Sequence, residues 1–143
     1  MDAGIKITIV WWDDDLVELE IIASNGRFAG RCRFYEQHDV FAKLAESMKD
    51  FPCLADDARK LALGNFDPAC GGGGFRFEMA CRDRAGHADM RVFVRADGDD
   101  TFGKPETAFF SIPVEAAGID SFVSALEHME LKQGATVRLR TAT

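Results

Sequence analysis

The sequence predicts a single α+β domain over residues 1–143, with one twisted antiparallel sheet of about six strands and two amphipathic helices packed on one face of this sheet. Apolar residues that alternate with polar ones indicate half-buried strands, and apolar residues at helical spacing indicate two helices. Turn residues between neighbouring strands indicate hairpins. Hydrophobic residues make up 47% of the 143 residues and include twelve Phe, which is enough for a core and argues against disorder.

The N-terminal part of the chain predicts three consecutive antiparallel strands. Residues 5–11 alternate in polarity, and this period places Trp11 inward and Trp12 outward. The acidic residues that follow predict a turn, and Asn25-Gly26 is typical of a two-residue hairpin turn. That turn sets a register with charge pairs on one face and apolar pairs on the other. The predicted pairs are Glu18–Arg33, Glu20–Arg31, Val17–Phe34 and Leu19–Cys32.

Two segments have the apolar spacing of amphipathic helices. We expect Asp39 to cap the first helix, which ends near Phe51 because Pro52 disfavours helical backbone at the preceding residue. We expect the second helix to begin at Asp120 or slightly earlier. The apolar stripes are Val40, Phe41, Leu44, Ala45 and Met48 in the first helix, and Ile119, Phe122, Val123, Leu126 and Met129 in the second.

Further strands are expected after each helix, and two of them form a second hairpin. In this hairpin a loop at 83–86 places Glu78 opposite Arg91, again with charges on one face. The segment 55–66 fits a strand that ends at Gly64, with a short helix as the alternative. Because strands followed by a helix occur twice, we also expect an internal duplication. The remaining expected strands are 75–81, 88–95, 106–114 and 136–140.

The net charge restricts the class of binding partner, and the cysteines and the N-terminus bear on metal binding and on the cellular compartment. The formal net charge of -7 disfavours nucleic acid and anionic membranes and favours basic or neutral protein partners. The same charge also serves simply to keep a small domain soluble. The four cysteines have no zinc-site spacing. The N-terminus lacks signal-peptide features, and no apolar run is long enough to cross a bilayer. We therefore expect a cytoplasmic protein without a cofactor.

Three motifs that could carry ligand chemistry are incomplete. The glycine run Gly71–Gly74 leads into a strand and lacks the Lys and the Ser or Thr of a phosphate-binding loop. The acidic clusters at 13–15 and 97–100 lack the spaced ligands and the distal Glu of a calcium-binding loop. We therefore predict a linker or bulge at the glycine run, solvated turns at the acidic clusters, and no metal site.

One candidate for partner binding is an aromatic residue next to an acidic turn. Trp12 is followed directly by Asp13, Asp14 and Asp15. Aromatic side chains dominate interface energies, and exposed charges steer the encounter of two proteins. The alternative is that Trp12 folds over the end of the core.

A second candidate is the pair of Asp83 and His87, at the two ends of the expected hairpin loop. A carboxylate that orients an imidazole is half of the arrangement used in general base catalysis. No nucleophile is recognisable beside this pair, because none of the serines lies in a nucleophile-elbow motif. We therefore assign no catalytic residue and treat both residues as candidates for partner binding.

Short motifs in the middle and at the end of the chain follow an order that resembles a known family. They include Gly64-Asn65-Phe66-Asp67-Pro68, Asp83-Arg84-Ala85-Gly86-His87 and Pro113-Val114-Glu115-Ala116-Ala117. From about Phe28 to Met129 the chain resembles a family of small, mostly uncharacterised bacterial proteins that is similar to the WapI-type immunity proteins. The resemblance implies a protein that neutralises a contact-dependent toxin by binding it, and it implies no catalytic residue.

The sequence therefore leads to one main hypothesis and two alternatives. The main hypothesis is a non-enzymatic, acidic protein-binding module, an immunity protein that docks onto a basic bacterial toxin such as a nuclease. The first alternative is an enzymatic or small-ligand-binding domain with a pocket between sheet and helices near Asp83 and His87. The second alternative is a structural subunit that forms a symmetric dimer through an open sheet edge.

Overall fold

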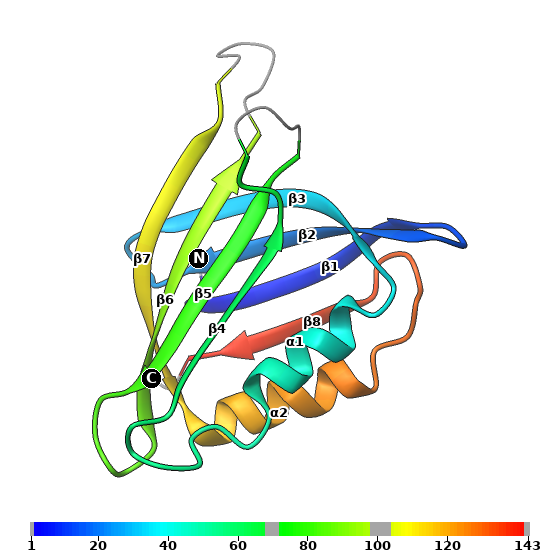
Figure 1. Ribbon diagram of the computed structural model, residues 1–143. Helices are drawn as coiled ribbons and strands as arrows, with labels where there is room; N and C mark the ends of the chain where they lie inside the picture. The colour runs from blue at the N-terminus through cyan, green and yellow to red at the C-terminus, as the bar shows by residue number, and fades with distance from the viewer. Residues whose placement is uncertain (1, 68–71, 98–103, 142–143) are drawn as a thin grey trace.

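The computed structural model describes residues 2–67, 72–97 and 104–141, which form two four-stranded antiparallel sheets and two helices (Figure 1). Sheet A has the strand order β3-β2-β1-β8, and sheet B has the order β4-β5-β6-β7. The strands are β1 (Gly4–Trp12), β2 (Leu16–Ser24), β3 (Ala29–Gln37), β4 (Ala58–Gly64), β5 (Gly74–Cys81), β6 (His87–Ala96), β7 (Glu106–Glu115) and β8 (Thr136–Arg140). The helices are α1 (Val40–Met48) and α2 (Ala116–Glu127).

The α+β class and the two helices are confirmed, but the prediction of one sheet of about six strands is wrong. Each group of three consecutive strands, β1–β3 and β5–β7, is followed by a helix, after which the chain enters the other sheet. Thus β4 pairs with β5, and β8 pairs with β1. The order strand, strand, strand, helix, strand occurs twice along the chain. Alternation of polarity identifies the buried face of a strand but not its neighbours, so it could not separate the two sheets.

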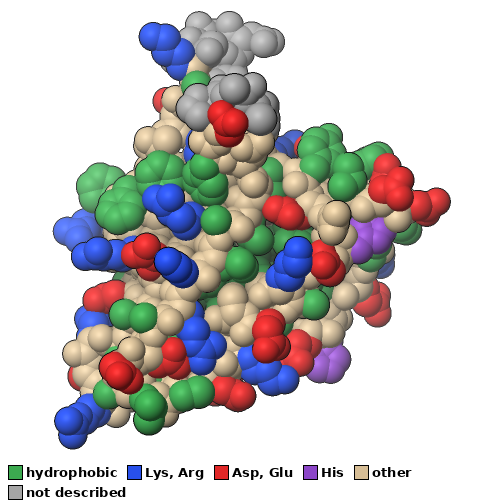
Figure 2. All heavy atoms as spheres, in the orientation of Figure 1, with side chains coloured by type: hydrophobic (Ala, Val, Ile, Leu, Met, Phe, Trp, Pro, Cys, Tyr) green, Lys and Arg blue, Asp and Glu red, His purple; other side chains and the backbone are tan. Residues whose placement is uncertain are grey.

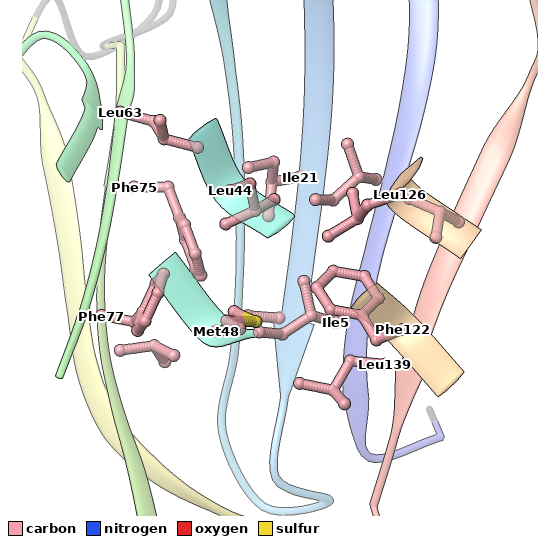
Figure 3. Packing of buried hydrophobic residues seen from close by; sticks show 14 of the residues in the cluster. Ile5, Ile21, Leu44, Met48, Leu63, Phe75, Phe77, Phe122, Leu126 and Leu139 are labelled. Carbon is pink, nitrogen blue, oxygen red and sulfur yellow. The ribbon is translucent and has the colours of Figure 1, made fainter. Parts of the chain in front are cut away.

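Both sheets and both helices contribute to one cluster of buried hydrophobic residues. In Figure 1 the strands of the two sheets cross steeply, and α1 and α2 lie side by side in the angle between the sheets. Figure 3 shows Leu44 and Met48 of α1 pointing into this angle. Phe75 and Phe77 approach them from β5, while Phe122 projects from α2. Burial of these apolar surfaces is the main force that holds the two sheets together.

The hairpin of β2 and β3 has a register that differs by two residues from the predicted one. The turn has four residues, because the Asn25 side chain accepts two backbone N–H groups within it at 3.0 and 2.8 Å. Glu20 consequently lies opposite Arg33, whose Nε donates to Glu20 Oε2 at 2.9 Å. A shift of two residues keeps every side chain on its predicted face. The observed pairs are Glu18–Tyr35, Val17–Glu36, Leu19–Phe34 and Glu20–Arg33.

The second hairpin has the predicted register, with Glu78 opposite Arg91 and Phe77 opposite Val92. The ambiguous segment after the first helix forms β4, so the alternative of a short helix is wrong. This strand ends at Gly64, as expected.

The helices bury the predicted apolar stripes, and only their ends differ from the prediction. Asp39 precedes α1 but makes no side-chain capping bond; its Oδ2 lies 3.6 Å from Lys43 Nζ instead. Helix α2 begins at Ala116, before Asp120, and Met129 lies beyond its end. In the part of the chain that the structure describes, no helix combines the length and apolarity needed to span a membrane.

The described glycines of the Gly71–Gly74 run allow backbones to pack closely. Gly73 N–H donates to the Arg33 carbonyl oxygen at 2.8 Å, and a Cβ on Gly73 would lie 2.7 Å from the Arg95 carbonyl oxygen. Arg95 is only 5% exposed, and its Nη1 donates to the Gly72 carbonyl oxygen at 2.8 Å. Close packing, rather than the predicted linker or bulge, therefore explains Gly73. Gly71, together with residues 98–100 of the second acidic cluster, lies outside the described residues.

We expect Gly73→Ala to destabilise the protein by about 2 kcal/mol, because the added methyl group overlaps backbone atoms that cannot rotate away. The measurement is urea unfolding followed by circular dichroism. Gly134→Ala is the control: it has open space around its Cβ but a φ of 86°, so it should cost about 1 kcal/mol. An unchanged urea midpoint for Gly73→Ala would contradict the close approach.

Arg59 of β4 links the end of α1 to the loop that follows it. Its Nε and Nη2 donate to the Asp57 carboxylate at 2.8 and 2.9 Å. Its Nη1 donates to the carbonyl oxygens of Lys49 at 3.0 Å and Ser47 at 3.3 Å. These bonds satisfy carbonyl groups at the helix end. The hydrogen bonds from Arg59, followed by one from a backbone N–H, lower the pKa of Asp57 below its ordinary value.

The Asp57–Arg59 pair should make stability depend on pH. A carboxyl whose pKa is lowered by folding stabilises the protein above its unfolded value of about 3.9, and this contribution is lost as the pH falls further. Asp57→Asn should therefore cost about 1 kcal/mol at pH 7 and progressively less below about pH 4. Urea unfolding of both proteins from pH 7 to 3 measures the difference. The matched control is Asp56→Asn, which removes the neighbouring exposed carboxylate; equal curves for both variants would refute the role of Asp57.

Candidate functional site

The β1–β2 hairpin exposes two adjacent tryptophans, Trp11 by 44% and Trp12 by 41%. The register shifts between Ile9 and Trp11, so that Trp11 lies opposite Glu18 and Trp12 lies opposite the buried Val17. Trp11 therefore lies on the outer face of sheet A, and Trp12 lies on the core side at the end of the sheet. The prediction that Trp11 points inward and Trp12 outward is wrong, because a bulge moves the alternation by one residue.

Two further apolar side chains lie next to these tryptophans. The rings of Trp11 and Tyr35 meet edge to face, with centroids 6.2 Å apart and an interplanar angle of 81°. Tyr35 is 56% exposed and Leu16, at the start of β2, is 39% exposed. Figure 2 shows hydrophobic side chains beside acidic ones at this end of the molecule, on the right of the view. We call the group Trp11, Trp12, Asp13, Asp14, Asp15, Leu16 and Tyr35 the acidic–aromatic tip.

The turn in the acidic–aromatic tip is held by Asp13. Its Oδ1 accepts the backbone N–H groups of Asp15 and Leu16, both at 2.8 Å, and these bonds lower the pKa of Asp13 below its ordinary value. The imidazole Nε2 of His38 lies 2.8 Å from the Asp13 carbonyl oxygen and donates to it. The side chains of Asp14 and Asp15 form no ion pair within the described residues. Asp13 therefore shapes the turn, while Asp14 and Asp15 are available to a partner.

The structure brings Asp83 and His87 together, with His87 Nδ1 2.6 Å from Asp83 Oδ2. On the other side of the ring, His87 Nε2 lies 3.7 Å from Glu115 Oε1. The pKa of Asp83 is lowered, first by the hydrogen bond from His87 and then by the N–H of Ala85, which donates at 2.8 Å. The group connects the β5–β6 loop to the end of β7 and stays nearly half exposed.

The described surroundings of His87 contain neither a hydrogen-bonded nucleophile nor a group placed to hold a metal ion. Among the described residues, no Ser, Thr or Cys side chain is hydrogen-bonded to His87. Across the same residues, no group of His, Cys, Asp and Glu is placed to hold a metal ion. A hollow of about 820 Å³ lies between β3 and the adjoining ends of β6 and β7, and neither Asp83 nor His87 lines it.

The six residues predicted for partner binding form two separate groups. Trp12 and the three acidic residues lie at one end of sheet A, whereas Asp83 and His87 belong to the β5–β6 loop at the end of sheet B. The two groups lie on opposite sides of the molecule (Figure 1). A single binding site that uses both groups is therefore not supported.

Sequence reasoning missed the exposure of Trp11 and the contributions of Leu16, Tyr35 and His38. Tyr35 lies on the polar face of its strand, two residues after the exposed Arg33. Its exposure could therefore have been expected from the alternation alone. No sequence signal marks the bulge that turns Trp11 outward. His38 reaches the tip from the end of β3, so its contact depends on tertiary structure.

Comparison of this chain with protein-family models, with curated proteins and with solved structures found no match. The relationship to immunity proteins therefore stays a prediction from sequence motifs.

Proposed function

We propose that this protein is a non-catalytic binding module that neutralises a basic protein partner, as an immunity protein does, and that it docks through the acidic–aromatic tip. The observation that carries the proposal is the joint exposure of Trp11 and Trp12 beside Asp14 and Asp15. Indole rings lose a large apolar surface to water when they are buried in an interface. The neighbouring carboxylates and the net charge of -7 would attract a basic surface before contact.

The construction of the tip supports a preformed binding element. The two hydrogen bonds to Asp13 Oδ1 and the contact from His38 fix the turn without a partner. The edge-to-face contact with Tyr35 restricts the ring of Trp11. Less conformational entropy is lost on binding when anchor side chains are already ordered.

The proposal predicts that the tip is required to capture and inhibit a basic protein. Immobilised wild-type protein should retain such a partner from a native lysate, and one equivalent should abolish the activity of that partner. Trp12→Ala, and separately Asp14→Asn combined with Asp15→Asn, should weaken both effects by about tenfold or more. The affinity is measured by calorimetry with the purified partner.

The matched control for this experiment is Phe28→Ser, which removes an exposed aromatic side chain from the turn between β2 and β3, at the other end of these strands from the tip. It should retain full capture and inhibition. Failure to retain any protein partner would refute the proposal, as would a partner that is bound equally well by the tip variants.

The alternative function, a small-ligand or catalytic site, rests on the contact between Asp83 and His87 and the proximity of Glu115. A ligand that binds the folded state raises the melting temperature. In a thermal-shift screen of metal ions and metabolites, we expect every compound that stabilises the wild type to stabilise His87→Gln as well. A large shift that depends on His87 would favour the alternative.

A further inference from the structure

The outer face of sheet B carries a row of three phenylalanine rings. Phe66, which follows β4, lies 5.8 Å from Phe93 of β6, and Phe93 lies 6.3 Å from Phe109 of β7, measured between ring centroids. Phe109 is 63% exposed. Figure 2 shows this region at the upper left, where hydrophobic side chains adjoin Lys and Arg side chains. Exposed aromatic clusters of this kind mark interaction surfaces more often than isolated apolar residues do.

Basic side chains accompany these rings. The Arg76 guanidinium lies over Phe93 and Phe66, 4.8 and 5.5 Å from their ring centroids. In the next row of the sheet, Lys60 and Arg91 lie on either side of Glu78. Within residues 2–67, 72–97 and 104–141, no ion pair involves Lys60, Arg76 or Arg91. We call Phe66, Phe93, Phe109, Lys60, Arg76 and Arg91 the aromatic–basic face.

The neighbouring strand edge restricts how a partner could bind here. The carbonyl oxygen of Ser111 on β7 accepts a hydrogen bond from Asn25 Nδ2 at 3.0 Å, and Pro113 has no N–H to donate. These features disfavour the addition of a further strand along this part of β7. A partner would therefore contact the side chains of the aromatic–basic face rather than extend the sheet.

We propose that the aromatic–basic face binds a short protein segment that presents carboxylates next to aromatic or aliphatic side chains. Arginine guanidinium groups bind carboxylates with two parallel hydrogen bonds, and Phe109 offers an open apolar surface beside them. The net charge of -7 repels a long polyanion such as nucleic acid, whereas in these two rows of sheet B the three cations outnumber the one carboxylate, that of Glu78. This surface is separate from the acidic–aromatic tip, so the inference does not rest on the proposed function.

Fluorescence anisotropy with labelled six-residue peptides tests the inference. The probe is Glu-Phe-Gly-Glu-Phe-Gly, and the comparison probes are Lys-Phe-Gly-Lys-Phe-Gly, Glu-Ser-Gly-Glu-Ser-Gly and a twelve-nucleotide oligo-dT. The wild type should bind the Glu-Phe peptide at least about tenfold more tightly than any comparison probe, and the affinity should fall with added salt.

Variants locate the binding surface. Arg76→Gln, Arg91→Gln and Phe109→Ser, all at exposed positions, should each weaken binding of the Glu-Phe peptide by about tenfold. Arg138→Gln and Arg140→Gln each remove an exposed cation from β8 of sheet A and should change the affinity less than about twofold. The inference is overturned if the Glu-Phe peptide does not bind, if oligo-dT or the Lys-Phe peptide binds as tightly, or if the sheet A variants weaken binding as much as the sheet B variants.

Discussion

The structure depends on the burial of the apolar faces of both sheets in one core, to which both helices also contribute. Leu44 of α1 and Phe122 of α2 enter this core from the helices. The strands β4 and β8 each follow a helix and complete the sheet formed by the opposite half of the chain. Each half of the chain therefore supplies an edge strand for the sheet of the other half, and both helices pack into the core that the two sheets share.

Much of the fold could be predicted because local polarity patterns determine which side of each element is buried. The second hairpin, with Phe77 opposite Val92, has its predicted register, since its loop length can be read from the chain. The first hairpin differs because hydrogen bonds to the Asn25 side chain lengthen its turn, which no polarity pattern reveals. The division into two sheets could not be predicted, because it depends on where the chain goes after each helix.

The candidate site was predictable only where its residues are neighbours in the sequence. Trp12 and the three acidic residues after it form one turn, so their proximity follows from the chain itself. Tyr35 and His38 reach the acidic–aromatic tip from another strand, and a bulge turns Trp11 outward. The aromatic–basic face likewise combines Phe66, Phe93 and Phe109 from three separate segments. Such surfaces arise because the pairing of strands in a sheet places side chains from distant parts of the sequence next to one another.

The shared core is tested most directly by following the unfolding of both sheets in the same urea titration. Both tryptophans belong to sheet A, so their fluorescence reports on that sheet, while hydrogen exchange of peptides from β5 and β6 reports on sheet B. One core predicts the same urea midpoint for both signals, in the wild type and in Phe77→Ala, whose substitution lies in sheet B. Loss of protection in β5 and β6 at a urea concentration that leaves the tryptophan signal unchanged would contradict a shared core.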